Sequence, residues 1–254
     1  MKKIKLTVEL LSDTCLGSGA GLASLVDQEL LYDRLGFPMA NGKTVKGWMV
    51  EACADIICGL GKYATKNIKD AAERLFGNPG DGLDETLLFI GDAHFPDEIR
   101  AQEIHEFETK KANLLERIND EKPQTIHGQI LSEYHQRVNV NKESYSRIRH
   151  QTAIESTGDS KGVAKDGSLR TIRVINRGNS LVSELYYSGG EAYEKTDLDL
   201  LCAVVACVRR VGLNRTRGLG KVKCSLSMNG DDVFFERHVK NFVDSVEKTI
   251  KEDK

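Results

Sequence analysis

The alternation of strand-like and helix-like periodicity along the chain most constrains its fold. Polar residues alternate with apolar ones over Lys2–Leu11, the pattern of a strand with one buried face. Apolar residues then recur at helical spacing over Lys43–Cys58 and Ile68–Phe76, before an apolar strand over Thr86–Ile90. This part of the chain therefore predicts a strand, two helices and a second strand, the beginning of a layered structure.

The same kinds of element return later in the chain. Strand patterns cover Tyr145–Ile154, Leu169–Ile175 and Ser180–Tyr187, an amphipathic helix covers Leu198–Gly212, a strand covers Lys221–Met228, and a surface helix covers His238–Lys251. The core order is strand, helix, strand, then strand, strand, helix, strand. This order resembles the ferredoxin-like, or RRM-like, α+β arrangement, an antiparallel sheet backed by helices.

Two segments do not belong to this core pattern. Residues 97–141 are polar and predict a helical insertion, with a charged helix over Glu98–Ile118. Residues 155–168 are polar and rich in glycine, which predicts an extended hairpin or exposed loop. A length of 254 residues fits one large domain or two small ones. Because the insertion shows no second core, we predict a single domain over residues 1–254.

The distribution of charge narrows the possible ligands. The formal net charge is −2, which argues against a generic polyanion binder. The stretch Val205–Ser225 nevertheless carries six cations and no acid, whereas acids concentrate in residues 97–121 and after Glu236. We therefore expect one basic face on an otherwise acidic protein.

Cysteine spacing and hydropathy indicate the compartment. The six cysteines contain no Cys-x-x-Cys pair, so we expect reduced thiols in the core, including the four in helical patterns: Cys53, Cys58, Cys202 and Cys207. The longest apolar runs are far shorter than a membrane span. Lys3 and Lys5 alternate with apolar residues, which is unlike a signal peptide. A cytoplasmic protein is expected.

A glycine-punctuated loop and a lysine-bearing helix start make the first candidate anion site. Its residues, in chain order, are Gly17, Ser18, Gly19, Gly21, then Asp27 and a short strand over Glu29–Tyr32, and finally Asn41, Lys43 and Lys46. Glycines let the backbone approach a phosphate, and a helix start offers unpaired N–H groups with a favourable dipole. Solubilising lysines and a solvated loop acid are the alternative interpretations.

Other cations are candidates for the same kind of ligand. Arg215, Arg217 and Lys221 flank a glycine turn, and an ordinary hairpin with basic flanks is the alternative there. Arg147 and Arg149 face one way on a predicted strand, where they could follow a row of phosphates. The neighbouring His150 fits a hydrogen-bonding surface or interface residue better than a catalyst. Lys161 lies in the 155–168 loop, which could also be a loop without a task.

Four stretches in order resemble the RAMP superfamily of CRISPR-associated proteins, in particular the repeated backbone subunit of type III effector complexes. They are the glycine loop with Val26-Asp27, Tyr32-Asp33 and Phe37–Gly47; Leu75-Phe76-Gly77 with Leu87–Ala93; Arg149–Ile154 with Gly167–Leu169; and Thr216–Val222. Together they span most of residues 4–228. Met39-Ala40-Asn41 and the 97–141 insertion depart from the family pattern.

The resemblance implies RNA-guided cleavage of RNA. Copies of such a subunit stack along a guide RNA (crRNA), and each inserts a hairpin thumb, here residues 155–168, between guide and target RNA. Active members hold one aspartate, matched by Asp27, near the target backbone for cleavage that depends on Mg²⁺ or Mn²⁺. The implied partners are the crRNA guide, the target RNA, other effector subunits, and further copies or paralogues of the chain.

Two other functions stay open at this point. A non-cutting scaffold, or a cap for the 5′ end of the guide, would keep the RNA contacts and lack the chemistry at Asp27. A small-molecule enzyme with a nucleotide phosphate in the glycine loop belongs to a different class. Residues 17–21 do not match the P-loop, and they precede a loop and short strand where a dinucleotide-binding fold has a helix.

Overall fold

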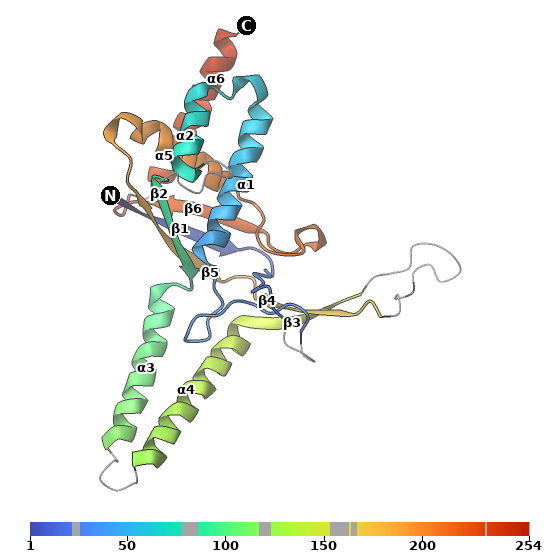
Figure 1. Cartoon of the computed structure of the whole chain (residues 1–254), viewed down its shortest axis with the longest axis vertical. Coiled ribbons are helices and arrows are strands. Elements are labelled where there is room, and N and C mark those ends of the chain that lie inside the picture. Colours follow the sequence, from blue (N-terminus) through green and yellow to red (C-terminus); the bar gives the residue numbers. More distant parts are fainter. Residues whose placement is uncertain are drawn as a thin grey trace.

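The structure is a computed structural model that describes residues 1–21, 26–77, 86–116, 123–152, 163, 167–231 and 233–253. Its core is one sheet covered by helices (Figure 1). The strands are β1 (Lys2–Leu10), β2 (Leu88–His94), β5 (Ser180–Tyr187) and β6 (Val222–Ser227), and the helices are α1 (Gly42–Leu60), α2 (Lys66–Phe76), α5 (Glu191–Cys207) and α6 (Phe234–Glu252). The strand order is β2-β5-β1-β6, and all neighbours are antiparallel. This is the predicted ferredoxin-like arrangement.

Alternation along the strands determines which face of the sheet is covered. Buried and partly exposed residues alternate strictly along β5, with Leu181 and Leu185 among the fully buried ones. On β1 the buried set includes Ile4 and Val8. These residues and the apolar sides of the four helices form one continuous core. The opposite face of the sheet carries the polar members of the same alternation.

One buried ionic cluster joins three elements of the core. Asp197 of α5 has no exposed surface and accepts hydrogen bonds from Arg74 Nη2 on α2, at 2.6 Å, and from the Tyr187 hydroxyl on β5, at 2.8 Å. Burial and the bond to this carboxylate raise the pKa of Tyr187. The Arg74 guanidinium also lies 4.4 Å from the centre of the Tyr193 ring. Each charge is paired, so the cluster is structural.

Two predicted elements are wrong in extent or kind. α5 spans Glu191–Cys207, whereas the apolar pattern predicted a helix over Leu198–Gly212. Its first two turns are polar, and acids at a helix start favour helix formation through the dipole without an apolar signal. The predicted strand over Glu29–Tyr32 is not regular, because its residues make isolated bridges to two separate partners, Leu30 to Gly17 and Tyr32 to Pro38.

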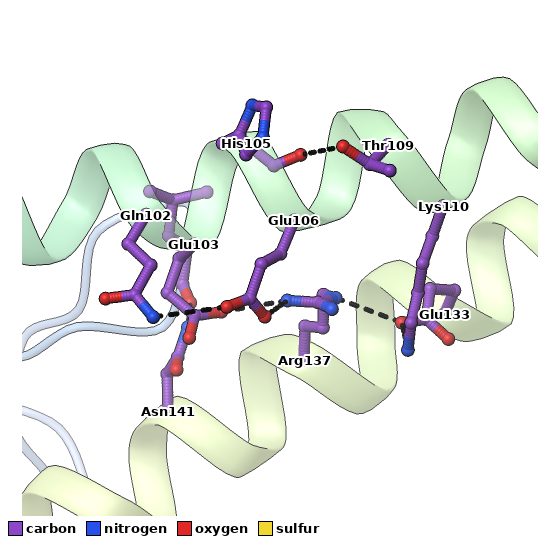
Figure 2. A network of polar contacts seen from close by, with 10 residues as sticks. Gln102, Glu103, His105, Glu106, Thr109, Lys110, Glu133, Arg137 and Asn141 are labelled. Atoms are coloured by element: carbon purple, nitrogen blue, oxygen red, sulfur yellow. Dashed lines mark hydrogen bonds and ion pairs between the residues drawn. The ribbon is translucent and has the colours of Figure 1, made fainter.

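The 97–141 segment contains most of a helical hairpin that projects from the sheet (Figure 1). Its helices are α3 (Asp97–Glu116), which has no buried residue, and α4 (Pro123–Tyr145). Arg137 of α4 joins the two helices through ion pairs of 3.1 and 3.3 Å to Glu103 and Glu106 of α3, and it also pairs at 3.0 Å with Glu133 of its own helix (Figure 2). Lys110 adds a 2.7 Å pair to Glu133. The hairpin therefore holds together largely by charge.

The base of this hairpin is fixed by aromatic packing. Tyr145, the last residue of α4, has its ring centroid 5.1 Å from that of Phe37 and 4.7 Å from that of Phe95. Asn141 donates a 2.8 Å hydrogen bond to the Leu35 carbonyl. These contacts attach the loop before α1 to α4, and α4 leads directly into the next strand.

A second, two-stranded sheet begins where α4 ends. β3 (Ser146–Gln151) pairs antiparallel with β4 (Arg170–Ile175), and Ile172 and Val174 pack with Cys15 and Leu219 in a small separate core. The pair extends sideways from the body (Figure 1). Most of the predicted thumb, residues 155–168, and with it Lys161, lies outside the described residues, so that prediction stays untested.

The cysteine prediction holds in part. All six are free; Cys15, Cys53, Cys202 and Cys224 are buried, but Cys58 and Cys207 are exposed, so these two are not core thiols. Both lie near the ends of their helices, where the apolar side reaches solvent. In the described ranges no helix combines the length and apolar character that a membrane crossing needs.

Candidate nucleic-acid interface

Three segments that are far apart in sequence meet around one pocket of about 290 Å³, which we name the glycine-loop pocket. Its lining comes from the glycine loop, the start of α1 and the turn after α5: Leu16, Gly17, Ser18, Leu31, Met39, Ala40, Asn41, Thr44, Trp48, Glu51, Gly212, Leu213 and Arg215. The pocket thus has an apolar floor and a polar rim. It brings together the predicted residues Gly17, Ser18, Asn41 and Arg215.

The glycine loop is held by its own hydrogen bonds. Ser18 donates its backbone N–H to the Glu29 carbonyl at 2.8 Å, and Glu29 donates its own to the Ala20 carbonyl at 3.0 Å. A side chain at Gly17 would lie 2.9 Å from Leu213, and one at Gly21 would lie 2.8 Å from the Asp27 carbonyl. Close packing against the backbone therefore requires Gly21, whereas the end of the Leu213 side chain can move away from a larger residue at position 17. Gly19, with φ +83° and open space around it, forms the exposed bend.

Part of the predicted anion site at the start of α1 is already used by the protein. The Asn41 side chain caps the helix by accepting the Thr44 N–H at 2.8 Å, and Asp92 accepts the Gly42 N–H at 2.7 Å. A carboxylate therefore occupies the favourable end of the helix dipole. Lys43 and Lys46 lie on the outer side of this helix, and in the described part of the chain no acid pairs with either of them.

Arg215 borders the glycine-loop pocket, and a carboxylate neutralises its charge. Its Nη1 lies 2.8 and 2.9 Å from the two carboxylate oxygens of Glu51 on α1. Trp48, one turn earlier on α1, is only 9% exposed and belongs to the core, and it also lines the pocket. Arg215 and Arg217 belong to one short 3-10 turn.

Arg217, the other arginine of this turn, borders a second hollow of about 490 Å³ that we name the Asp27 hollow. Its lining combines the Asp27 segment with the base of the β3–β4 pair and the same turn: Asp27, Gln28, Gln151, Gly167, Leu169, Arg170, Ile172, Leu213, Asn214 and Arg217. Arg217 donates to the Gln151 side chain at 3.1 Å. In the described residues no acid forms an ion pair with Arg170 or Arg217, and Asp27 is the acid in the lining that these two guanidinium groups share.

Asp27 is exposed and tied to β4. Its Oδ2 accepts the Thr171 N–H at 2.7 Å and lies 3.4 Å from the Thr171 hydroxyl, while its own N–H donates to the Thr171 carbonyl at 2.8 Å. All hydrogen bonds to this carboxylate from the described residues reach Oδ2, which leaves Oδ1 directed elsewhere. Sequence reasoning predicted the acid but not its strand partner.

A single carboxylate sets the kind of metal site that Asp27 can form. Among the described residues no group of three or more His, Cys, Asp or Glu side chains could hold a metal ion. Mg²⁺ is commonly bound by one or two carboxylates together with phosphate oxygens and water. The residues present therefore fit an ion that is shared with RNA, and they do not fit a metal site made by the protein alone.

Arg147 and Arg149 share one face of β3, as predicted, but they contact a buried acid. Both guanidinium groups pair with Asp13 Oδ2, Arg149 at 3.2 Å, and the Asp13 side chain is 3% exposed. Asp13 also accepts the Arg177 N–H at 3.3 Å, and its carbonyl accepts the Gly220 N–H at 2.9 Å. Asp13 therefore fastens the β3–β4 pair to the end of β1.

The remaining predicted residues lie apart from the two hollows. His150 is exposed on the face of β3 opposite to the two arginines. Lys221 is exposed beside the glycine turn, where its N–H donates to Ser12 at 2.8 Å. Sequence reasoning missed Asp13, Glu51, Gln151 and Arg170. Only Asp13 carried a usable signal, because it is the one acid between the first strand and the glycine loop.

Comparison with known proteins identifies the family. The model of the RAMP superfamily matches residues 7–223, which is most of the chain. One similar structure is a chain of Type III-B Cmr-beta in the apo state, with a TM-score of 0.54, 12% identity, and coverage of 91% of this chain and 98% of that chain. Another is a chain of Type III-B Cmr-beta bound to cognate target RNA, with a TM-score of 0.55, 10% identity, and coverage of 94% and 99%.

These identities are low enough that the two structures establish a shared fold and no more. A search of curated protein sequences finds no match. The family match, by contrast, extends from β1 into β6 and includes both hollows. The chain therefore belongs to the RAMP superfamily.

Proposed function

We propose that this chain is an RNA-binding subunit of a type III CRISPR effector complex, of the III-B kind, and that it holds a guide RNA and acts on the target RNA paired with it. The observation that carries this proposal is the meeting of the glycine loop, the start of α1 and the Arg215–Arg217 turn around adjacent hollows. Two relatives in fold belong to Type III-B Cmr-beta assemblies, and one of these was determined with cognate target RNA.

Phosphate binding is assigned to the Asp27 hollow and its surroundings. Arg170 and Arg217 offer forked donors that suit phosphate oxygens, and no acid of the described chain competes for them. Lys43 and Lys221, which are exposed, and Lys46, which is partly exposed, add positive charge on the segments that carry the pocket linings. Such contacts are to the RNA backbone, so sequence specificity comes from pairing between guide and target.

Asp27 is the residue we assign to cleavage. In RNA the 2′-oxygen can attack the adjacent phosphorus, so that a new P–O bond forms while the bond to the 5′-oxygen breaks. The Asp27 carboxylate, held by Thr171, would orient the target backbone at this step. Bound Mg²⁺ or Mn²⁺ would supply charge stabilisation for the phosphate. The arrangement requires RNA oxygens to complete the ion's shell.

The test separates charge from position at residue 27. Asp27→Asn keeps an oxygen that can accept the Thr171 N–H but removes the negative charge. In a reconstituted complex we expect target cleavage to fall by about a hundredfold or more with guide binding unchanged. Thr171→Ala, which removes only the 3.4 Å hydroxyl contact, is the matched control and should cleave normally.

A non-cutting scaffold or guide cap is the second candidate. The observation in its favour is that Asp27 already has a structural role, since it holds β4 through Thr171. If Asp27→Asn binds guide and cleaves target at the normal rate, the chain is a scaffold and the catalytic assignment is wrong.

A further inference from the structure

The face of the sheet that points away from the helices is open in the described structure. The residues of this open sheet face share one side of the four strands, as the pairing register requires: Lys3, Lys5, Thr7, Glu9, Phe89, His94, Ser180, Val182, Glu184, Tyr186, Lys223, Ser225 and Ser227. None of them is buried, whereas their strand neighbours that face the helices are.

An aromatic pair stands at one end of the open sheet face. Phe89 on β2 is directly opposite Tyr186 on β5, and Tyr186 is in turn opposite Lys3 on β1. The two ring centroids are 6.2 Å apart, and Phe89 is 62% exposed. A phenylalanine this exposed on a regular strand gains nothing from the core, so its packing gives no structural reason for it.

The positions of the neighbouring side chains are fixed by hydrogen bonds. Glu184 accepts a hydrogen bond from the Tyr186 hydroxyl, and Lys3 Nζ lies 2.6 Å from the same carboxylate. The Tyr186 ring is therefore held in one orientation beside Phe89. Stacking surfaces of this kind lose little conformational freedom when a ligand binds.

We propose that the open sheet face binds single-stranded RNA, with bases stacked on Phe89 and Tyr186 and phosphates near Lys5 and Lys223. Four-stranded sheets of this topology bind unpaired bases through exposed aromatic residues. The cations on the face outnumber its acids, Glu9 and Glu184. Thr7, Ser225 and Ser227 are small and polar, so a strand of RNA can lie close to the sheet.

The composition of the face argues for RNA over a protein partner. Val182 is the only aliphatic side chain among its residues, and the others apart from the aromatic pair and His94 are hydroxyl-bearing or charged. The central part of a stable protein interface is more apolar than this. Stacked bases need flat rings and phosphates need cations, and the face offers both.

This surface is distinct from the two hollows. The aromatic row lies at the Lys3 end of β1, whereas the chain enters the glycine loop after Leu10, at the other end of the strand. Seven residues of extended strand place these ends roughly 20 Å apart. The inference therefore goes beyond the proposed function, and neither requires the other to be correct.

The experiment uses the full chain with Arg170→Ala and Arg217→Ala already in place, so that the Asp27 hollow contributes little. A short unstructured RNA labelled with fluorescein is titrated by anisotropy. Adding Phe89→Ala should weaken binding about tenfold, whereas Phe89→Trp should preserve it. Tyr193→Ala, which removes an aromatic residue that is 54% exposed on α5, is the matched control and should have no effect.

A spectroscopic readout locates the RNA. In Phe89→Trp, stacking of bases on the new indole should quench its fluorescence beyond any change of the Trp48 signal, which the same titration of the chain with Phe89 measures. Equal affinity of the Phe89→Ala and Phe89 chains, or an unquenched signal at saturating RNA, would overturn the proposal. So would the loss of Phe89→Ala from the assembled complex with its RNA affinity unchanged, because that result identifies a protein interface.

Discussion

The glycine-loop pocket and the Asp27 hollow each contain one arginine of the same short turn. In the described residues only one of these two arginines is paired with a carboxylate. Arg215 borders the glycine-loop pocket and is neutralised by both oxygens of Glu51. Arg217 borders the Asp27 hollow, where its side-chain partner is the neutral amide of Gln151. The glycine-loop pocket has an apolar floor of leucines, Met39 and Trp48, whereas the Asp27 hollow also contains Arg170.

We infer from this difference that the two hollows bind different parts of an RNA ligand. A paired guanidinium attracts an anion only after its carboxylate partner has been displaced, so the glycine-loop pocket suits a sugar or base better than a phosphate. Arg170 and Arg217 of the Asp27 hollow, which have no acid partner in the described residues, suit phosphates better, and Asp27 belongs to the same lining.

The largest expected effect comes from removing the cations of the Asp27 hollow. Arg170→Ala together with Arg217→Ala should weaken RNA binding about a hundredfold at moderate salt and lower the slope of log affinity against log salt by about two. Titration at several salt concentrations measures both quantities. If the salt slope equals that of the unchanged chain, Arg170 and Arg217 do not bind phosphate, and the proposed difference between the two hollows is wrong.

Asp13 holds the β3–β4 pair, which contributes to the lining of the Asp27 hollow. Its replacement should lower the stability of the protein. Asp13→Ala removes the buried acceptor for Arg147, Arg149 and the Arg177 N–H, and should lower the free energy of unfolding by about 2 kcal/mol. This expected loss in the free energy of unfolding is smaller than that for a fully buried ion pair, because both arginines are half exposed. Urea denaturation measures it, with the exposed Asp244→Ala as the control. A loss under half a kcal/mol would contradict it.

Arg215→Ala should have a smaller effect than its neighbour in the same turn. Because Glu51 already neutralises this guanidinium, we expect RNA affinity to fall only about threefold. The comparison to make is with the single variant Arg217→Ala, which should lose about tenfold under identical conditions. Equal losses would mean that Glu51 does not shield Arg215 once RNA is bound.

The smallest expected effect is a gain in RNA affinity, and it tests the same neutralisation of Arg215 by Glu51. Glu51→Gln releases Arg215 and should tighten RNA binding about twofold at low salt. The gain should disappear at high salt, where exposed charges are screened. Tightening that persists in high salt would assign Glu51 a role other than neutralisation.

The regular elements could be predicted because periodicity is a property of neighbouring residues. The alternation over Ser180–Tyr187 gave β5 with its correct bounds, and helical spacing gave α1 to within two residues at its end. The first turns of α5 were missed because Glu191–Asp197 carries no apolar repeat. The family motifs located the segments that form both hollows.

Ion pairs between residues that are far apart in the chain could not be predicted from the sequence. Nothing in the sequence connects Glu51 with Arg215, or Asp13 with Arg147 and Arg149, because each pair spans the fold. For the same reason, cations that looked equivalent in sequence differ in the structure. Arg215 is neutralised, the β3 arginines hold a buried acid, and Arg217 is not paired with any acid in the described residues.

The central position of β1 has a consequence for how the chain is made. Both of its sheet partners, β5 and β6, are translated much later, so β1 leaves the ribosome roughly ten seconds or more before either can pair with it. During that interval both of its edges and its apolar side are unprotected. The lysines at positions 3 and 5 supply the charge that discourages the nascent strand from joining other chains.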